Sequence, residues 1–309
     1  MGSFYSRAAG AVGAVLAGVG LAAVPSAAQA QTISVACGDT PGLIAAITTA
    51  NAATSAKIRL GRNCTYDLTA AFAQVTPPAT RGPNGLPIIT GDISIDGRGS
   101  TIRRTVAAQF RILEVAAGAV LRATGLGISG GDAGAETGGG VLNARGRVLF
   151  DKSTISGNTA DNGAGLSNDS GDMRLERSTV SNNQTRANGG GGGGIYSDGF
   201  LMVERSRLTA NQANTNGGGL FSELGGRVVL NRSDITSNRA VLGTGGGLHN
   251  ADGGIVQGSR LKLEFNTATD GGAAFNGARA GSVTFSKSNF RSNSPNNCVP
   301  LNTLRGCRN

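Results

Sequence analysis

Hydrophobic and polar residues alternate in short runs along most of this chain. Each run is bounded by Gly, Asn, Asp or Ser residues. An alternation with a period of two over a few residues, closed by turn-forming residues, predicts short β-strands with one buried side. The clearest runs are Val148-x-Phe150, Met173-x-Leu175, Leu201-x-Val203, Val228-x-Leu230 and Val283-x-Phe285.

Two further marks recur in phase with these runs. Glycine triplets or their variants begin at Gly138, Gly163, Gly192, Gly217, Gly245 and Gly271. Each is followed by an asparagine, at Asn158, Asn183, Asn211, Asn238, Asn266 and Asn293. The steps between successive asparagines are 25, 28, 27, 28 and 27 residues. Two marks that keep phase over six copies indicate a structural repeat of about 27 residues.

Three short strands account for the length of one copy. One follows the glycines, the second is the alternating run, and the third ends at the asparagine. A serine stands five residues before each asparagine, with Leu261 as the one exception. Such strands bury their apolar sides together when they wind into a coil and each coil stacks in parallel on the next. The predicted fold class is therefore all-β, a parallel β-helix over residues 86–294, with coils about 4.8 Å apart.

Stacking gives the repeated residues a structural purpose. Counterparts in successive coils lie above one another, so the six asparagine amides are expected to donate and accept hydrogen bonds along a ladder. Glycine in the triplets permits the positive φ of a sharp bend. The sequence contains no G-x-x-x-x-G-K-[ST] motif, so a phosphate-binding loop of that type is excluded.

The two ends of the repeat region differ from its middle. In residues 31–85, Asp39 and Pro41 begin a predicted helix, with Leu43, Ile44, Ile47 and Ala50 at helical spacing. Strands are expected at residues 57–60 and 64–69. A helix lying across the first coil would cover its open edge, and residues 295–309 would close the other end.

Residues 1–30 have the features of a secretory signal peptide. Arg7 precedes an apolar run over residues 8–24, and Ala28-Gln29-Ala30 fits a cleavage site. A transmembrane anchor is the weaker interpretation, because the run is barely long enough and consists mostly of Ala and Gly. We therefore expect a secreted or extracellular protein with no transmembrane segment in the mature chain.

The four cysteines agree with export. They allow three pairings, of which Cys37–Cys64 and Cys298–Cys307 are favoured because each would staple one end in an oxidising compartment. Free thiols are one alternative. A zinc site is another, but no C-x₂-C spacing supports it.

Composition narrows the chemistry further. The 309 residues include one His, 10 Phe, 3 Tyr and no Trp. A single His excludes a multi-His metal site and leaves only one possible base for a Ser-His-Asp triad. Without the signal peptide, 27 basic residues face 19 acidic ones, a net charge of +8 that favours acidic polymers. The Arg residues are spread singly and aromatic residues are scarce, so specific nucleic-acid binding is not expected.

Several segments together carry a family resemblance. VACGDTPGLIAAITTAN, NCTYDLT, NGLPIIT, ISIDGRGSTIRR, the glycine and asparagine coils and a terminal SPNNC…GC resemble secreted bacterial right-handed parallel β-helix proteins. The coils are also similar to the repeats of polymorphic outer-membrane proteins, which pair a GG-A/G-φ element with F-x-x-N. Gly271-Gly-Ala-Ala and Phe290-Arg-Ser-Asn293 fit that pattern. The resemblance implies a right-handed coil, a secreted or cell-surface location and an adhesin-like role.

Parallel β-helices also include pectate lyases and polygalacturonases, so an enzyme has to be considered. The sequence has no adjacent Asp pair and no G-H-G, and only Arg260-Leu-Lys262 matches an R-x-K motif. His249 occupies a column that holds bulky side chains in most other copies, which is typical of stacked rings rather than of a catalytic base. Its counterparts are Leu142, Ser167, Tyr196, Phe221 and Phe275.

The best catalytic candidates lie in two adjacent columns. The first column holds Asp151, Glu176, Glu204, Asn231, Ser259 and Ser286. The residue after each of these is basic, giving Lys152, Arg177, Arg205, Arg232, Arg260 and Lys287. Glu176 and Glu204, with Arg177 and Arg205, are candidates for holding a hard cation or for acid/base work. The favoured alternative is a ladder of surface ion pairs.

We therefore expect a secreted, non-catalytic β-helix, an adhesion-type or surface protein that binds polysaccharide or anionic cell-wall polymers as a monomer. No metal site and no cofactor are expected. The alternative is a polysaccharide lyase or glycoside hydrolase of the pectin-degrading type, for which Ca²⁺ would be the cofactor. A structural fibre would require end-to-end stacking, which both predicted caps oppose.

Overall fold

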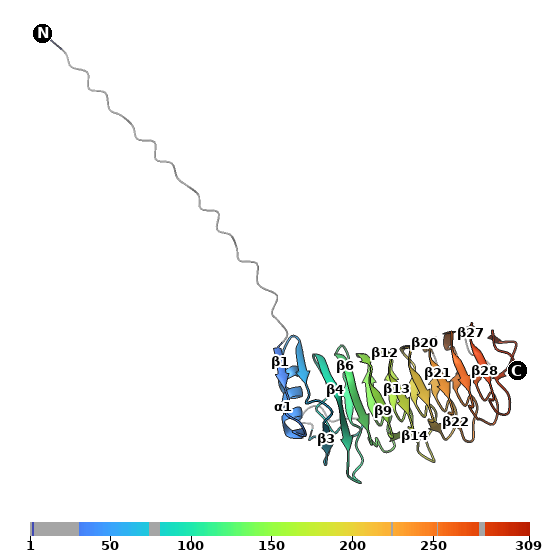
Figure 1. The fold of residues 1–309 in the computed structure, drawn as a ribbon, viewed down its shortest axis with the longest axis horizontal. Coiled ribbons are helices and arrows are strands. Elements are labelled where there is room, and N and C mark those ends of the chain that lie inside the picture. Colours follow the sequence, from blue (N-terminus) through green and yellow to red (C-terminus); the bar gives the residue numbers. More distant parts are fainter. Residues whose placement is uncertain (1, 3–30, 74–80, 224, 252, 278–281) are drawn as a thin grey trace.

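Short strands stack in parallel along the whole length of the molecule and form a β-solenoid, which confirms the predicted fold class (Figure 1). The computed structural model describes residues 2, 31–73, 81–223, 225–251, 253–277 and 282–309. Within these ranges the solenoid has about nine turns. The predicted signal peptide at residues 1–30 lies outside them, except for Gly2.

The strands form three long sets, one for each side of the coil. The first set consists of β4 (Asp92–Arg104), β6 (Val120–Ser129), β8 (Arg147–Asp151), β12 (Asp172–Glu176), β16 (Phe200–Glu204), β20 (Arg227–Asn231), β24 (Ile255–Ser259) and β27 (Val283–Ser286). The second consists of β9 (Thr154–Ser156), β13 (Thr179–Ser181), β17 (Arg207–Thr209), β21 (Asp234–Thr236), β25 (Lys262–Glu264) and β28 (Asn289–Arg291). The third consists of β5 (Leu113–Val115), β7 (Val141–Ala144), β11 (Leu166–Asp169), β15 (Ile195–Ser197), β19 (Leu220–Ser222), β23 (Leu248–Asn250), β26 (Ala274–Asn276) and β29 (Cys298–Val299).

The alternating runs fix which residues point inward. In β12, Met173 and Leu175 are buried while Arg174 between them is exposed, and in β16 and β20 the buried residues likewise alternate with half-buried ones. The register is in phase from coil to coil, so that Met173 pairs with Leu201 and Glu176 pairs with Glu204. The inward residues of all three sets therefore form one continuous apolar core along the solenoid axis.

A fourth set of strands was not predicted. Four coils add a two-residue strand between the second and third sets: β10 (Thr159–Ala160), β14 (Gln184–Thr185), β18 (Gln212–Ala213) and β22 (Arg239–Ala240). The glycine triplet of a neighbouring coil passes very close, because a Cβ placed on Gly193 would lie 2.4 Å from the carbonyl carbon of Gln212. The inward residues here are small for that reason, and strands this short leave no alternation to detect in the sequence.

The six repeat asparagines form a continuous ladder of buried hydrogen bonds. The Nδ2 atom of each donates to the Oδ1 atom of the next at 2.9–3.0 Å, from Asn158 through Asn293. The same Oδ1 atoms accept from backbone N–H groups, as in the 3.0 Å contact from Asn211 N to Asn238 Oδ1. The second Nδ2 hydrogen of Asn211 reaches the carbonyl of Val180 at 2.9 Å. These amides therefore satisfy the backbone at a bend that recurs in every coil.

The glycine triplets supply the bend expected of them. The first glycine of each triplet has a positive φ between +54° and +73°. The third lies where the next coil meets the asparagine ladder, since a Cβ on Gly194 would be 2.5 Å from the Gly219 carbonyl oxygen and 3.0 Å from Asn211 Cγ. A larger residue at position 194 would therefore push against the next coil at this point.

The N-terminal end is covered as predicted by one helix, α1 (Thr40–Asn51). The Asp39 side chain caps it by accepting from the Gly42 backbone N–H at 2.8 Å. The strands β1 (Gln31–Ser34), β2 (Ala56–Arg59) and β3 (Thr65–Leu68) extend the stack, because β1 pairs with β2, and both β2 and β3 pair with β4. No helix in the described ranges is long and apolar enough to cross a membrane.

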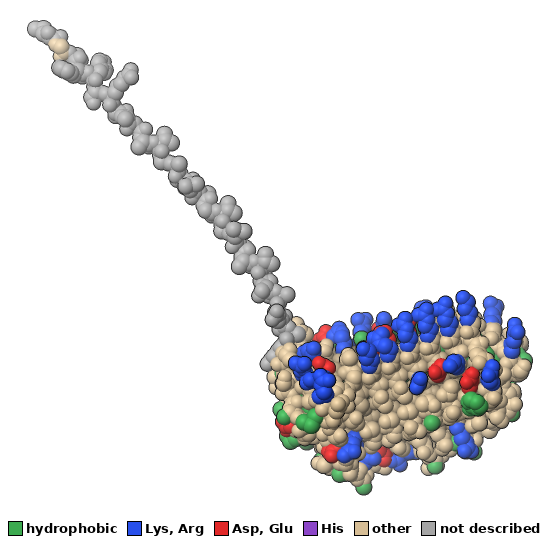
Figure 2. All heavy atoms as spheres, in the orientation of Figure 1, with side chains coloured by type: hydrophobic (Ala, Val, Ile, Leu, Met, Phe, Trp, Pro, Cys, Tyr) green, Lys and Arg blue, Asp and Glu red, His purple; other side chains and the backbone are tan. Residues whose placement is uncertain are grey.

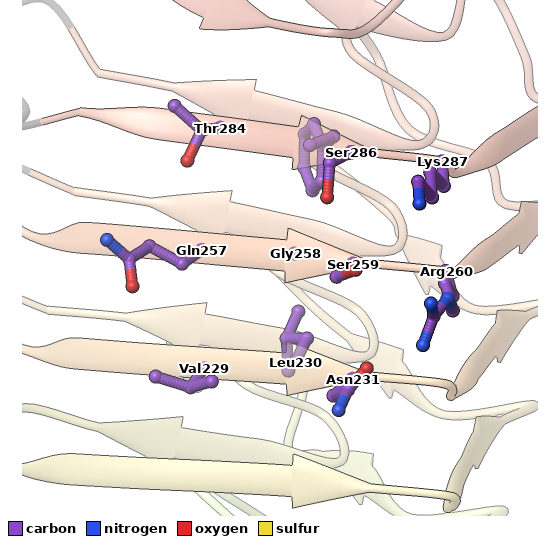
Figure 3. A pocket seen from close by; sticks show the side chains of 11 residues that line it. Val229, Leu230, Asn231, Gln257, Gly258, Ser259, Arg260, Thr284, Ser286 and Lys287 are labelled. Atoms are coloured by element: carbon purple, nitrogen blue, oxygen red, sulfur yellow. The ribbon is translucent and has the colours of Figure 1, made fainter.

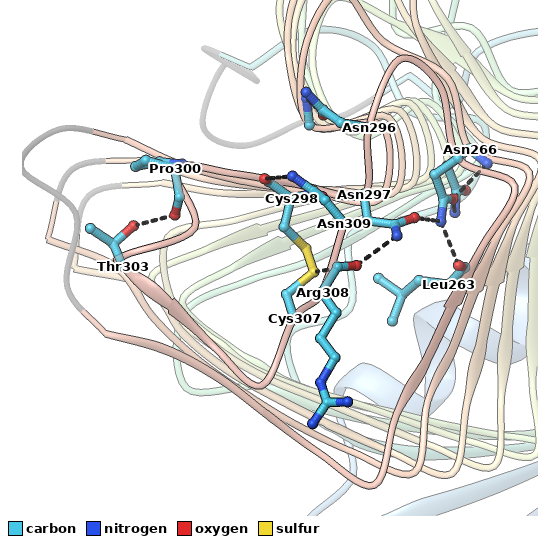
Figure 4. The surroundings of a disulfide bond; sticks show 12 residues. Leu263, Asn266, Asn296, Asn297, Cys298, Pro300, Thr303, Cys307, Arg308 and Asn309 are labelled. Carbon is cyan, nitrogen blue, oxygen red and sulfur yellow. Dashed lines mark hydrogen bonds between the residues drawn. A yellow bond between two sulfur atoms is a disulfide. The ribbon is translucent and has the colours of Figure 1, made fainter.

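Both predicted cysteine pairs are confirmed as disulfides. Cys37–Cys64 and Cys298–Cys307 have Cα–Cα separations of 5.4 and 6.3 Å. At the C-terminal end, β29 pairs with β26, and β30 (Leu304–Arg305) pairs with β27. The Asn297 side chain ends the asparagine ladder by accepting from Asn293 at 2.9 Å, and it donates to the Arg308 carbonyl at 2.7 Å (Figure 4). The disulfide therefore ties the last strands onto the final coil.

Candidate functional site

A row of basic side chains follows one corner of the solenoid. We call it the basic column, and it consists of Lys152, Arg177, Arg205, Arg232, Arg260 and Lys287. Each lies where a strand of the first set turns into the second set, and each has a left-handed backbone with φ between +48° and +54°. Figure 2 shows Lys and Arg side chains gathered in a row along this edge of the molecule.

Backbone conformation alone does not explain why these residues are basic. A left-handed φ is roughly 1–2 kcal/mol unfavourable for residues other than Gly, Asn and Asp. The next corner of each coil has the same conformation, with φ between +54° and +65°, but carries unrelated side chains. These are Gly157, Asn182, Ala210, Ser237, Phe265 and Ser292. The first corner thus keeps a cation in every one of these coils although the backbone does not require one.

In the first three of these coils two of the cations, Arg177 and Arg205, are paired with carboxylates. Arg177 contacts Asp151 at 2.8 Å and also Glu176. Arg205 lies 3.6 Å from Glu176 and 3.3 Å from Glu204, measured from Nη1 to Oε1. Arginine side chains and carboxylates therefore alternate along the surface of these coils, as the ion-pair interpretation of the two columns predicts.

The four catalytic candidates lie together, but their geometry is that of this ladder. Glu176 and Glu204 are neighbours in register, and the Arg205 guanidinium lies between their carboxylates. Their side chains are 36% and 22% exposed at an outward corner. A catalytic carboxylic acid usually lies in an apolar pocket, and a glycosidase places two carboxyl groups across a cleft. Neither arrangement is present at this pair.

The last three coils keep the cations and lose the carboxylates. Asn231, Ser259 and Ser286 replace the acidic residues. Arg232 retains only a 3.9 Å contact with Glu204. Within the described residues, no carboxylate lies within ion-pairing distance of Arg260 or Lys287.

The net charge of the chain is also unevenly distributed between these two parts. Residues 31–231 contain 18 basic and 15 acidic side chains, whereas residues 232–309 contain 9 basic and 4 acidic ones. The net charge is therefore +3 in the first segment and +5 in the shorter second segment. The C-terminal coils thus carry more net positive charge per residue than the rest of residues 31–309.

A shallow groove of about 520 Å³ runs beside the uncompensated cations. Its outer column is formed by Val229, Gln257 and Thr284, from β20, β24 and β27, and Arg260 and Lys287 stand at the strand ends (Figure 3). Asn231, Ser259 and Ser286 lie between the two columns. Most of these side chains are short, whereas Arg174, Met202 and the two glutamates fill the same positions in the preceding coils. The groove thus offers amide and hydroxyl groups next to free positive charge.

The single histidine lies in a stack of rings. The His249 ring centroid is 5.0 Å from that of Phe221 and 5.0 Å from that of Phe275. Its Nδ1 atom is 2.8 Å from Thr244 Oγ1, and the residue is 8% exposed. Tyr196 continues the stack, with its hydroxyl donating to Glu223 at 3.1 Å. The geometry supports the packing interpretation of this column.

A second polar ladder lies inside the third strand set, and the sequence reasoning missed it. Asn143 donates to Asn168 at 2.7 Å, Asn168 donates to Ser197 at 3.0 Å, and Asn250 donates to Asn276 at 2.8 Å. The ladder is interrupted from Ser197 to Asn250, and within the described part of the chain the Oγ atom of Ser222 and the Oδ1 atom of Asn250 have no hydrogen-bond partner. Its signal is present in the sequence, because an Asn or Ser stands five residues after the first glycine of every triplet.

No group of three or more His, Cys, Asp and Glu side chains suited to a metal ion occurs among the residues with described positions. The chain was compared with models of protein families, with curated proteins and with solved structures, and none of them matches it. The function therefore has to be inferred from the charges and hydrogen-bonding groups of this surface.

Proposed function

We propose that this protein is a secreted, non-catalytic β-helix that binds polysaccharide or anionic cell-wall polymers through its basic column. One observation carries the proposal: six coils present Lys or Arg at the same left-handed corner, while the equivalent backbone at the next corner accepts unrelated residues. A retained charge at a conformationally costly position supports a role in binding rather than in folding.

The geometry of the column suits a polymeric ligand. It presents one cation per coil on a rigid scaffold, at intervals of about 4.8 Å. A polymer with regularly repeated negative groups contacts several such cations at once, and each further contact adds to the affinity without a new loss of translational freedom. Binding of this kind needs no deep pocket and no convergent catalytic residues.

Other features support the location and the type of role. The signal-like residues 1–30 and the two disulfides support export. The similarity of the coils to polymorphic outer-membrane protein repeats supports a surface-associated, adhesin-like role. The pairing of Glu176 and Glu204 with arginines supports a non-catalytic protein, which requires neither Ca²⁺ nor another cofactor.

The test is to screen residues 31–309 against an array of glycans and cell-wall polymers, with and without Ca²⁺. Binding is expected for acidic polymers and not for neutral ones, and it should weaken as salt is raised because exposed charges are screened. Incubation with uronate polymers should produce no cleavage. A Glu176→Ala/Glu204→Ala variant serves as a control, because it should bind acidic polymers at least as well as the wild type. Ca²⁺-dependent cleavage by the pure protein, or no binding to any acidic polymer, would overturn the proposal.

A further inference from the structure

We infer that the binding site is confined to the last three coils of the basic column and that its ligand is a uronate polymer, a polysaccharide with a carboxylate on its sugars, lying along the solenoid axis. This inference rests on the proposed function and deepens it. The carboxylates would meet Arg232, Arg260 and Lys287, and the sugar rings would lie in the adjacent groove.

The two halves of the basic column differ in how far their charge is neutralised. Arg177 and Arg205 are neutralised by neighbouring carboxylates, so their charge is already satisfied within the protein. The same carboxylates would repel an anionic chain that approached those coils. Arg260 and Lys287 are exposed and face serines in place of acids. An anionic ligand would therefore be attracted mainly to the C-terminal half, because Lys152 is the one cation of the first half without a carboxylate partner among the described residues.

The distance between successive coils is similar to the length of one sugar along a polysaccharide. The column residues follow strands that stay in register, with Asn231 paired to Ser259 and Ser259 paired to Ser286. Their cations therefore repeat at about the coil spacing of 4.8 Å. An extended chain of pyranose rings advances by a similar length for each sugar, so successive carboxylates meet successive coils. The planar guanidinium groups of Arg232 and Arg260 also suit carboxylates, which they bind through two parallel hydrogen bonds.

The side chains that line the groove suit a carbohydrate. Gln257, Thr284 and Ser259 offer amide and hydroxyl groups that can exchange hydrogen bonds with sugar hydroxyls, and Val229 offers an apolar contact to a ring. The only aromatic residue in the lining is Phe285, which is 6% exposed and belongs to the core. Single-stranded nucleic acids bind by stacking bases on exposed aromatic rings, so this groove favours a carbohydrate.

The experiment compares two matched triple variants for binding to polygalacturonate. In the first, Arg232, Arg260 and Lys287 are changed to Asn. In the second, Lys152, Arg177 and Arg205 are changed to Asn. Asparagine tolerates a left-handed φ, and both variants lose three cations from the same column. The first should bind about tenfold or more weakly, while the second should stay within about threefold of the wild type.

A third variant tests the division without removing any cation. Ser259→Glu/Ser286→Glu restores the acidic column in the last two coils, in the arrangement that Glu176 and Glu204 already adopt. It should fold normally by circular dichroism and lose polygalacturonate binding by about tenfold or more. Unchanged binding by this variant would overturn the inferred site.

The remaining outcomes separate this inference from the proposed function. Equal losses in the two triple variants, with wild-type binding intact, would overturn the site and leave the proposed function standing. Failure of the wild type to bind any acidic polymer would overturn both. Tighter binding to dextran sulfate or to single-stranded DNA than to polygalacturonate, at equal ionic strength, would overturn the uronate assignment.

Discussion

An asparagine in the middle of the ladder shows how one side chain stabilises three coils at once. Asn211 accepts from the side chain and backbone of Asn183 at 3.0 and 3.1 Å and donates to Asn238 at 3.0 Å. It is 1% exposed, so water cannot replace a lost partner. A hydrogen bond made by such a group contributes little on its own, but leaving its neighbours unpaired is costly.

Replacing Asn211 with Leu should therefore lower the free energy of unfolding by about 1–3 kcal/mol, because the amide of Asn183 and the Oδ1 of Asn238 would lose partners in a buried site. Chemical denaturation of the wild type and the variant would measure the loss. Asn188→Leu is the control, since Asn188 is exposed in the loop before β15, and it should change stability by less than about 0.5 kcal/mol. An equal effect of the two substitutions would contradict the ladder's role.

Tyr196 provides a prediction that depends on pH. Burial, followed by the negative charge and hydrogen bond of Glu223, raises the pKa of the Tyr196 hydroxyl well above its ordinary value. The neutral phenol is thus favoured in the folded state, so its contribution to stability is complete below the unfolded-state pKa of about 10 and is lost as the pH rises further. Spectrophotometric titration should give the same phenolate absorbance around pH 10 for the wild type and for Tyr196→Phe, because Tyr196 does not ionise in that range. A difference curve that titrates in that range would contradict the assignment.

At the scale of one coil, two exceptions to the repeat explain each other. Gly258 occupies an inward position that Leu230 and Phe285 fill in the adjacent coils, and Leu261 replaces the repeat serine. A Cβ on Gly258 would lie 2.7 Å from Leu261 Cδ1 and 2.6 Å from Phe285 Cδ1. The Leu261 side chain is 2% exposed, so it fills the space that the glycine leaves in the core.

A double-mutant cycle tests this compensation. Leu261→Ser should destabilise the protein by about 2–4 kcal/mol through the cavity it leaves. Gly258→Val should cost about 1–3 kcal/mol through overpacking against Leu261. The double variant has the Val and Ser pair that Val203 and Ser206 form two coils earlier, so its loss should be smaller than the sum by at least about 0.5 kcal/mol. Losses that simply add would show that the two positions are independent.

The coil also shows what the sequence could predict. The strands, the asparagine ladder and the glycine bends recur six times at one phase, and repetition separates their signal from chance. The exchange between Gly258 and Leu261 occurs once, and it becomes visible only when the inward direction of both side chains is known. The second ladder was missed because some of its positions hold Asn and others Ser, although both can form hydrogen bonds at the same place.

The candidate site was predictable in part. The acidic and the basic column both follow from counting along the repeat, because residues at the same position of successive repeats become neighbours in a parallel stack. The left-handed backbone of the basic column was not predictable, because Arg and Lys carry no preference for that conformation, unlike Gly or Asn. The groove depends on the short side chains of three adjacent strands seen together, which no single copy of the repeat contains.

The molecule as a whole is a stack whose two ends would each offer unpaired strand edges to another copy. Helix α1 packs at the first coil, with Leu43 and Ile47 buried, and β29 and β30 lie over the last. The Asn309 side chain also hydrogen bonds to the backbone of Cys298, accepting from its N–H at 2.8 Å and donating to its carbonyl at 3.2 Å. A helix therefore covers one end, and the outermost strands at the other end are only two residues long, which leaves little backbone for another copy to pair with.

This capping predicts an elongated monomer in solution, with scattering curves that do not change with concentration. Cys298→Ser/Cys307→Ser should release the last strands, because the disulfide closes their loop and contributes about 2–3 kcal/mol. Faster hydrogen exchange at β29 and β30 and concentration-dependent growth in scattering mass are expected, since the edges of β26 and β27 would then be free to pair. Cys37→Ser/Cys64→Ser is the matched control, and α1 should keep that variant monomeric. Filaments formed by the wild type would contradict the capping role, because a stack with covered ends has no edge on which another copy can add.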